Sequence, residues 1–471
     1  MPFNSFEYLF FFLPIVWLSY ILLRRTRLRS VVLVTSGYVF YGWAQPWIVS
    51  LLFLSSTTDF LIGRWLDRTD RPKTRRMLLI LSLIFNVGLL GVFKYSGWLF
   101  DNFNAVFTVL HVPIHLPALK PSLPPGISFY TFQSLSYIID IYRRKLHAHP
   151  KLWEYWSFVA FFPQLFAGPI ERTGHLLPQL THPRKRIQPR MIEMGVFMIA
   201  WGLFKKLVVA DNMSGIVELC RDNMALHGAG VLLALAFTFQ IYADFSAYTD
   251  IARGSARLLG ISLRRNFMTP YFAHNPSEFW RRWHMSLSTW IRDYVYISLG
   301  GNRYGPGRTL FNLVATMFLA GLWHGAGWFF VLWGIYHGAL LCVYHVWPLD
   351  RWLERAFGKA GRVISILWMF ALVTFGWVIF YLGEIGHFMR VFYPNKPGAP
   401  FVSGAQIAYG IFLFGLPLIC TDWLGFRKHR EFVDLWPHLT ARAKVLVYLL
   451  IFYGIVIFGA RESHEFIYFH F

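Results

Sequence analysis

His324 is the residue of this sequence best suited to chemistry. It lies in an otherwise apolar run, residues 311–333, with Gly321, Gly325 and Gly327 around it. Ionisable side chains at membrane depth are costly and usually mark a functional site, and glycine-rich backbone is tolerated there only where protein buries it or it lines a cavity. A neutral imidazole in such a place can accept the proton of a hydroxyl that attacks a carbonyl. We therefore predict that His324 is a general base; the alternative is a core histidine bonded to a neighbouring carbonyl group.

The segment 278–293 surrounds a second histidine, His284, with cationic and indole side chains: Arg281, Arg282, Arg292, Trp280, Trp283 and Trp290. Arginines beside indoles can bind a nucleotide diphosphate through bidentate hydrogen bonds and cation–π contacts. The same composition is equally typical of an anchor at the membrane interface, and the sequence leaves both readings open. We predict that His284 is the second catalytic residue, as a partner base or a substrate-positioning donor; the alternative is an interfacial histidine. The predicted substrate-binding residues of this segment are Arg281, Arg282, Trp283 and Arg292.

Asp244, Trp323 and His337 complete the predicted substrate-binding set. Trp323 directly precedes His324, whereas His337 lies further along the chain and is expected to be structural or to line a tunnel. Asp244 shares an apolar segment with Asp250. The two carboxylates are expected either to pair with arginines of the 278–328 stretch or to contact substrate.

The sequence lacks the motifs of several other classes of enzyme. We find no Ser-His-Asp order, no P-loop and no GxGxxG in a βαβ setting. No His, Cys and carboxylate residues have the spacing of metal ligands, so we predict no bound metal or cofactor. The cysteines, Cys220, Cys342 and Cys420, are isolated and indicate neither a disulfide framework nor a zinc site.

The composition is that of a polytopic membrane protein. Of the 471 residues 56% are hydrophobic and only 15% are charged, where a soluble domain has about a quarter. Aromatic residues make up 19%, which suits lipid contact and interfacial belts. The net charge of +21 fits basic cytoplasmic loops, or a cytoplasmic face that attracts a coenzyme phosphate or anionic lipid. Nucleic acid is not an expected partner, because the basic residues lie in short loops between apolar segments.

Apolar segments that alternate with basic loops must carry these residues. We predict an all-α fold of 11 or 12 membrane spans around a central tunnel, with the candidate segments 6–23, 31–43, 47–62, 77–93, 127–141, 195–210, 231–251, 310–323, 327–346, 363–382, 406–423 and 445–458. The first is expected to be a span rather than a cleavable signal peptide, with the N-terminus outside. No internal repeat and no separate soluble segment is visible, so residues 1–471 are predicted to form one integral-membrane domain.

Some segments depart from this simple pattern. Residues 153–169 are apolar but contain Pro163 and Pro169, and we predict a re-entrant or interfacial segment. The span 231–251 carries several polar groups, so one of its faces should line a cavity or the span should end early. Asp59 is either a solvated end or an inward-facing polar group. The segments before and after His324 are expected to be two arms that meet near it.

The motifs that contain these residues also resemble a known family, the membrane-bound O-acyltransferases, in the branch of the bacterial alginate O-acetyltransferases. The resemblance rests on residues 278–293, 299–303 and 321–325, and further on residues 125–132, 243–250 and 466–471. It extends over essentially the whole chain. The branch is related to the D-alanyl transfer protein of teichoic acid modification. The family pattern has Gly in place of Ala247 and commonly Gln in place of His470, which concerns the acceptor rather than the reaction.

The resemblance implies a helical bundle around a transmembrane tunnel, with His324 as the family's catalytic histidine and His284 as its second important one. It implies acetyl-CoA as the cytoplasmic acyl donor and an exported polysaccharide or peptidoglycan as acceptor, reached through a periplasmic acetyltransferase partner. The expected location is the bacterial inner membrane. Acylation of cellulose, or of a lipid or protein hydroxyl, and a non-catalytic transporter or scaffold are the alternatives.

Overall fold

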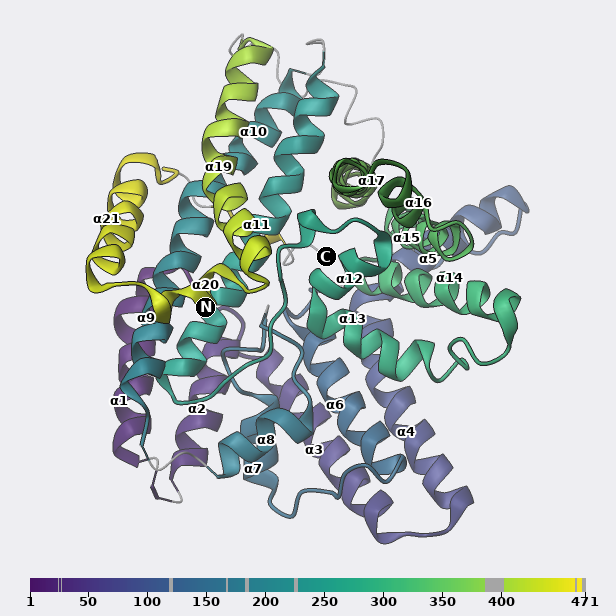
Figure 1. Ribbon diagram of the computed structural model, residues 1–471. Coiled ribbons are helices and arrows are strands. Elements are labelled where there is room, and N and C mark those ends of the chain that lie inside the picture. The colour runs from purple at the N-terminus through teal and green to yellow at the C-terminus, as the bar shows by residue number, and fades with distance from the viewer. Residues whose placement is uncertain are drawn as a thin grey trace. The chain divides into compact units, whose positions relative to one another are not determined.

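The computed structural model describes residues 1–23, 25–26, 28–117, 122–166, 168–182, 186–223, 228–385, 402–461 and 464–467. Every regular element in these ranges is a helix, and the predicted all-α class is confirmed (Figure 1). Contacts divide the chain into two compact units, Met1–Ile192 with Ser255–Arg264, and Glu193–Gly254 with Arg265–Phe471. The single domain stays a prediction. His470 and parts of the basic runs 24–29 and 183–186 lie outside the described residues.

The first unit consists of helices near the N-terminus. They are η1 (Glu7–Phe12), α1 (Leu13–Leu23), α2 (Arg29–Gly42), α3 (Ile48–Arg68), α4 (Pro72–Leu90), η2 (Gly91–Tyr95), α5 (Ser96–Val109), α6 (Ile127–Tyr142), α7 (Leu152–Val159) and α8 (Thr173–Thr181). The 8-residue α7 is too short to cross a bilayer, which needs about 20 residues. It occupies the start of the segment predicted to be re-entrant or interfacial.

Asp59 of α3 faces inward. Its side chain is fully buried, and its carboxylate accepts hydrogen bonds from Ser82 Oγ at 2.6 Å and from Asn86 Nδ2 at 2.9 and 3.0 Å. Buried polar groups are stable only when they are hydrogen-bonded, and α4 supplies both partners. The second of the two alternatives for Asp59 is therefore correct.

The second unit holds all the predicted site residues. Its elements include most of α9 (Pro189–Phe204) and of α11 (Ala229–Leu258), then η3 (Lys205–Ala210), α10 (Asp211–Asp222), η4 (Pro270–Phe272), α12 (Pro276–Arg282), α13 (Met285–Ile291), η5 (Arg292–Tyr296), α14 (Gly305–His324), α15 (Trp328–Val346), α16 (Leu349–Phe357), α17 (Lys359–Ile385), α19 (Gly404–Lys428), α20 (Phe432–Leu435), η6 (Trp436–His438) and α21 (Ala441–Phe458).

Six helical stretches of the described chain are long and apolar enough to cross a membrane. They are Pro72–Val109, Ala229–Leu258, Trp328–Val346, Lys359–Gly383, Gly404–Lys428 and Ala441–Phe458. Glu7–Leu23 is apolar but shorter. A multi-pass membrane protein is thereby confirmed, and the count of 11 or 12 spans stays a prediction.

The polar groups of α11 are held by ion pairs. Asp244 lies 2.9 Å from Lys206 Nζ, and Asp250 lies 2.8 Å from Lys205 Nζ and 3.4 Å from Arg253. The expected pairing with arginines of the 278–328 stretch is wrong, because the two lysines of η3 lie next to the two aspartates instead. The helix runs for 30 residues and does not end early.

Helices α14 and α15 form a tight hairpin with His324 at its tip, as the two predicted arms require. A Cβ on Gly321 would lie 2.2 Å from the carbonyl oxygen of Phe330, and one on Gly334 would lie 2.3 Å from that of Met317. The two backbones are therefore in direct contact, as small residues permit in membrane helix pairs. The turn between the helices, residues 325–327, lies against the ring of Phe330.

This contact predicts a difference between two glycines of the hairpin. Gly334→Ala places a methyl group against the carbonyl of Met317 and should lower the free energy of unfolding by about 1–3 kcal/mol or more. Gly307→Ala in α14 meets nothing within 4 Å and should be neutral or stabilising. Thermal unfolding of the purified protein in detergent checks both, and equal melting temperatures for the two variants would contradict the close crossing.

Candidate active site

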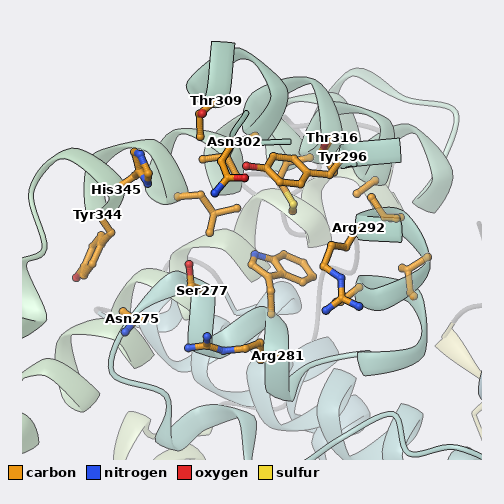
Figure 2. A pocket seen from close by; sticks show the side chains of 18 of the residues that line it. Asn275, Ser277, Arg281, Arg292, Tyr296, Asn302, Thr309, Thr316, Tyr344 and His345 are labelled. Atoms are coloured by element: carbon orange, nitrogen blue, oxygen red, sulfur yellow. The ribbon is translucent and has the colours of Figure 1, made fainter. Parts of the chain in front are cut away.

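A cavity of about 690 Å³ lies among α12, α13, η5, α14, α15 and α16, all in the second unit. Its polar lining consists of Asn275, Ser277, Ser288, Arg281, Arg292, Tyr296, Asn302, Thr309, Thr316, His324, Tyr344, His345, Asp350 and Arg351. In Figure 2, Ser277 and Arg281 lie on one side of the cavity, with Asn302 and Thr309 on the opposite side. A volume of this size is typical of small-molecule and cofactor sites.

His324 lines this cavity and is buried. It is the last residue of α14 and is 3% exposed. Aromatic rings surround its imidazole, with centroids at 4.9 Å for Trp323, 4.9 Å for Trp333 and 5.3 Å for Phe380. The rings exclude bulk water from a group that still lines the cavity. This is the environment in which a neutral imidazole can act as a base.

His284 connects α12 to α13 in a left-handed backbone conformation, with φ +40°. The side chain is fully buried, and burial lowers its pKa to about 3, so the imidazole is neutral at physiological pH. The ring of Phe245 lies edge-on at 4.7 Å and that of Trp323 lies at 5.8 Å. Trp323 therefore contacts both predicted catalytic histidines.

Positive charge gathers at the exposed part of the cavity. Arg281, Arg292 and Arg351 line it and are all solvent-exposed. Arg292 pairs with Asp293 at 2.8 Å, whereas no carboxylate of the described residues pairs with Arg281 or Arg351. Guanidinium groups that are not occupied by a carboxylate can bind phosphate oxygens.

Arg282 points away from the cavity lining. Its guanidinium pairs with Glu278 at 2.6 Å and donates a hydrogen bond to Thr269 at 2.8 Å. Burial alone would raise the pKa of Glu278, but hydrogen bonds from His274 and the charge of Arg282 hold that pKa at about 2. Arg282 is thus committed to a structural ion pair.

Three further predicted binding residues, in addition to Trp323, also lie outside the cavity lining. Trp283 is fully buried beside Trp377, with ring centroids 4.7 Å apart. His337 is fully buried beside Trp333 at 4.9 Å, and neither of its nitrogens has a hydrogen-bond partner within the described residues. Asp244 lies in the ion pairs of α11 described above. The structure thus brings His324, Arg281 and Arg292 together at one cavity, whereas His284 and Trp323 contact each other but do not line it.

The cavity also has residues that the sequence argument did not single out. Tyr344 and His345 come from the last turns of α15, and Asp350 and Arg351 from the start of α16. Helical spacing carries the signal, because Leu341, Tyr344 and His345 are three and four residues apart and share one face of α15.

Asn312 of α14 is a further residue that the sequence argument missed, and it holds a loop that lines the cavity. Its Nδ2 donates hydrogen bonds to the carbonyl oxygens of Leu299 at 3.2 Å and Gly301 at 2.8 Å. Gly300 and Gly301 turn the chain there with φ +106° and +59°. The 299–303 motif is therefore a loop held by Asn312, and it presents Asn302 to the cavity.

The sequence is similar to several known proteins. The sequence model of the membrane-bound O-acyltransferase family matches residues 35–382, a range that contains the whole cavity. The probable alginate O-acetylase AlgI of Azotobacter vinelandii is 40% identical over 383 residues, 81% of this chain and 75% of that protein. The AlgI protein of Pseudomonas aeruginosa is 41% identical over 391 residues, covering 81% and 72%. A peptidoglycan O-acetyltransferase of Helicobacter pylori is 32% identical over 409 residues, covering 80% and 76%.

Asn312→Leu is predicted to release the loop 299–303. The variant keeps the side-chain volume but leaves two carbonyl groups without their donor, which should cost about 1–3 kcal/mol of unfolding free energy. Limited trypsin digestion should then cut faster after Arg303. Asn302→Ala, which alters an exposed side chain of the same loop, should change neither stability nor cleavage. Equal cleavage of Asn312→Leu and wild-type protein would show that Asn312 does not hold the loop.

Proposed function

The chain belongs to the membrane-bound O-acyltransferase family and is an O-acetyltransferase, and on this premise we propose its donor, acceptor and location. The donor is acetyl-CoA, bound from the cytoplasm. The acetyl group crosses the bacterial inner membrane and reaches an exported polysaccharide such as alginate, through a periplasmic acetyltransferase partner. The single observation that carries the donor is the cavity, which has exposed arginines at one part and buried His324 at another.

The two parts of the cavity match the two ends of acetyl-CoA. Arg281, Arg292 and Arg351 lie where solvent reaches, and their charges suit the phosphates of the nucleotide. Met317 and Ala320 line the cavity on the same helix as His324 and offer an apolar surface to the acetyl thioester. A donor bound in this direction presents its carbonyl carbon to the imidazole.

The reaction then needs one base and one carbonyl-polarising donor. Neutral His324 accepts the proton of the acceptor hydroxyl while the hydroxyl oxygen attacks the thioester carbon. The new C–O bond forms, the C–S bond breaks, and the imidazolium returns the proton to the CoA thiolate. His284, neutral because it is buried, does not line the cavity; it positions the thioester or the acceptor from its place beside Trp323, whose ring also contacts His324.

Two acceptors have support from relatives. The AlgI proteins, named for alginate, are 40% and 41% identical to this chain. The relative named for peptidoglycan is 32% identical. We therefore propose alginate or a similar polysaccharide first and peptidoglycan second. A transporter or scaffold has no need of a buried histidine in the lining of a cavity.

His324→Ala tests the catalytic assignment. Loss of the general base should reduce acetyl transfer from labelled acetyl-CoA by about 100-fold or more. The protein would be assayed in nanodiscs with a cell-envelope extract that supplies both acceptor and partner. His115→Ala, which changes an exposed histidine of the first unit, should keep full activity. Equal turnover by His324→Ala and wild type would remove His324 from the mechanism.

Arg281→Gln tests the donor. Loss of one charge-assisted hydrogen bond, worth about 1.5 kcal/mol or more, should raise KM for acetyl-CoA about tenfold with little change in kcat. Acetyl-pantetheine lacks the nucleotide phosphates, so its KM should not change. Arg282→Gln is the matched neighbour: because Arg282 pairs with Glu278, this variant should lower the melting temperature and leave the preference for acetyl-CoA over acetyl-pantetheine intact. An equal KM increase for both donors in Arg281→Gln would rule out a phosphate contact.

A further inference from the structure

Residues 464–467, here called the docked segment, lie against α11 and η3 within the second unit. Lys206 Nζ donates a hydrogen bond to the carbonyl oxygen of His464 at 2.9 Å. The amide N–H of Ile467 donates to Asp244 Oδ2, also at 2.9 Å. Phe466 and Ile467 are 0% and 2% exposed. A residue of α11 and one of η3 thus bind the backbone of the docked segment directly.

The two residues that hold this backbone belong to a buried charge cluster. Lys206 Nζ lies 2.9 Å from Asp244 and 2.9 Å from Asp211, and all three side chains are buried. Burial of ions costs several kcal/mol each unless pairing and further hydrogen bonds offset it. Irregular backbone inside a membrane protein likewise needs partners for its polar groups. The cluster donates one hydrogen bond to the docked segment and accepts one from it.

Rings continue the contact from the docked segment to the active site. Phe466 stacks on Tyr248 with centroids 4.0 Å apart and lies 6.0 Å from Phe245. Phe245 in turn lies 4.7 Å from the imidazole of His284, at an interplanar angle of 84°. A single ring therefore separates Phe466 from a histidine of the proposed mechanism.

His284 needs such support because its backbone is strained. A positive φ on a residue with a side chain is uncommon, costs about 1–3 kcal/mol, and persists only where the surrounding structure imposes it. The rings of Phe245 and Trp323 both pack on this imidazole. Whatever fixes Phe245 also fixes the orientation of His284.

We propose that the docked segment is a positioning element for His284: Lys206 and Asp244 hold its backbone, and Phe466 holds Phe245 against the imidazole. The inference rests on the proposed function, because it assigns His284 to the reaction. Asp244 then acts through the docked segment rather than by contact with substrate. The acceptor or thioester meets a histidine whose orientation is set by residues more than 150 positions away in sequence, 466 against 284.

The variant Phe466→Ala tests whether the docked segment positions His284 or instead affects the binding of acetyl-CoA. The change removes the ring but leaves the backbone contacts to Lys206 and Asp244 in place. We expect kcat for acetyl transfer to fall about tenfold, in line with the cost of a small misplacement of a reacting group. KM for acetyl-CoA should stay within about twofold, since the arginine part of the cavity is untouched. Phe466→Leu, which keeps most of the volume, should restore most of kcat.

A double-mutant cycle tests the route through His284. His284→Asn is the partner variant, because Asn tolerates a positive φ and the fold should survive. If the docked segment acts through His284, Phe466→Ala should lower kcat no further in the His284→Asn background. If the fall in kcat of the double variant equals the product of the falls in the two single variants, the proposal is overturned.

Phe197→Ala is the matched control for lost packing. Phe197 is also fully buried in the second unit and stacks on Trp436 at 3.9 Å. Both Phe197→Ala and Phe466→Ala should lower the melting temperature, but Phe197→Ala should leave kcat unchanged. An equal loss of kcat in both would mean that Phe466 matters only for stability.

A readout that needs no activity keeps this inference apart from the proposed function. Carbethoxylation of His284 by diethyl pyrocarbonate, followed by mass spectrometry, should be slow in wild type, fast in Phe466→Ala and slow in Phe197→Ala. Wild-type protein that never uses acetyl-CoA would overturn the proposed donor while this comparison still stands. Equally slow modification of His284 in all three proteins would overturn the positioning role.

Discussion

The backbone contact between α14 and α15 is the constraint on which the site depends. At Gly321 and Gly334 the two helices meet so closely that neither position has room for a Cβ. Helices in a bilayer gain little from the hydrophobic effect when they associate, so this contact supplies much of what holds them together. Because α14 ends at His324 and α15 begins at Trp328, the same crossing places His324 in the lining of the cavity.

Neighbouring charges of the second unit serve different purposes according to the face on which they lie. Arg281 and Arg282 are adjacent on α12, and successive helical residues point about 100° apart. Arg282 faces Glu278, whereas Arg281 faces the cavity. The lysines of η3 are likewise taken up by carboxylates of α11 and α10. Charges paired within the protein hold helices together, whereas Arg281 and Arg351, which pair with no carboxylate of the described residues, stay available to an anionic ligand.

Much of this arrangement is predictable from the sequence, for identifiable reasons. Glycines beside a histidine in an apolar run predicted the hairpin and the place of His324, because few other structures tolerate that pattern in a membrane. The structural role of Arg282 was also accessible, since Glu278 precedes it by four residues on a helix. The partners of Asp244 could not be predicted from the sequence, because tertiary packing alone decides which cation lies nearest. Asn312 gave no signal, since its two carbonyl partners belong to a loop that forms only after the glycines turn the chain.

The two histidines proposed to be catalytic depend on different elements for their positions. His324 is fixed by the hairpin, whereas His284 is held by the α12–α13 connection and the ring of Phe245. Trp323 contacts both imidazoles: its ring centroid lies 5.8 Å from that of His284 and 4.9 Å from that of His324. It therefore connects the hairpin to the α12–α13 connection. Misplacement of a reacting group by about 1 Å can cost about 100-fold in rate. The packing of Trp323 against both imidazoles, and of Phe245 against His284, is therefore as important to the proposed chemistry as the imidazoles themselves.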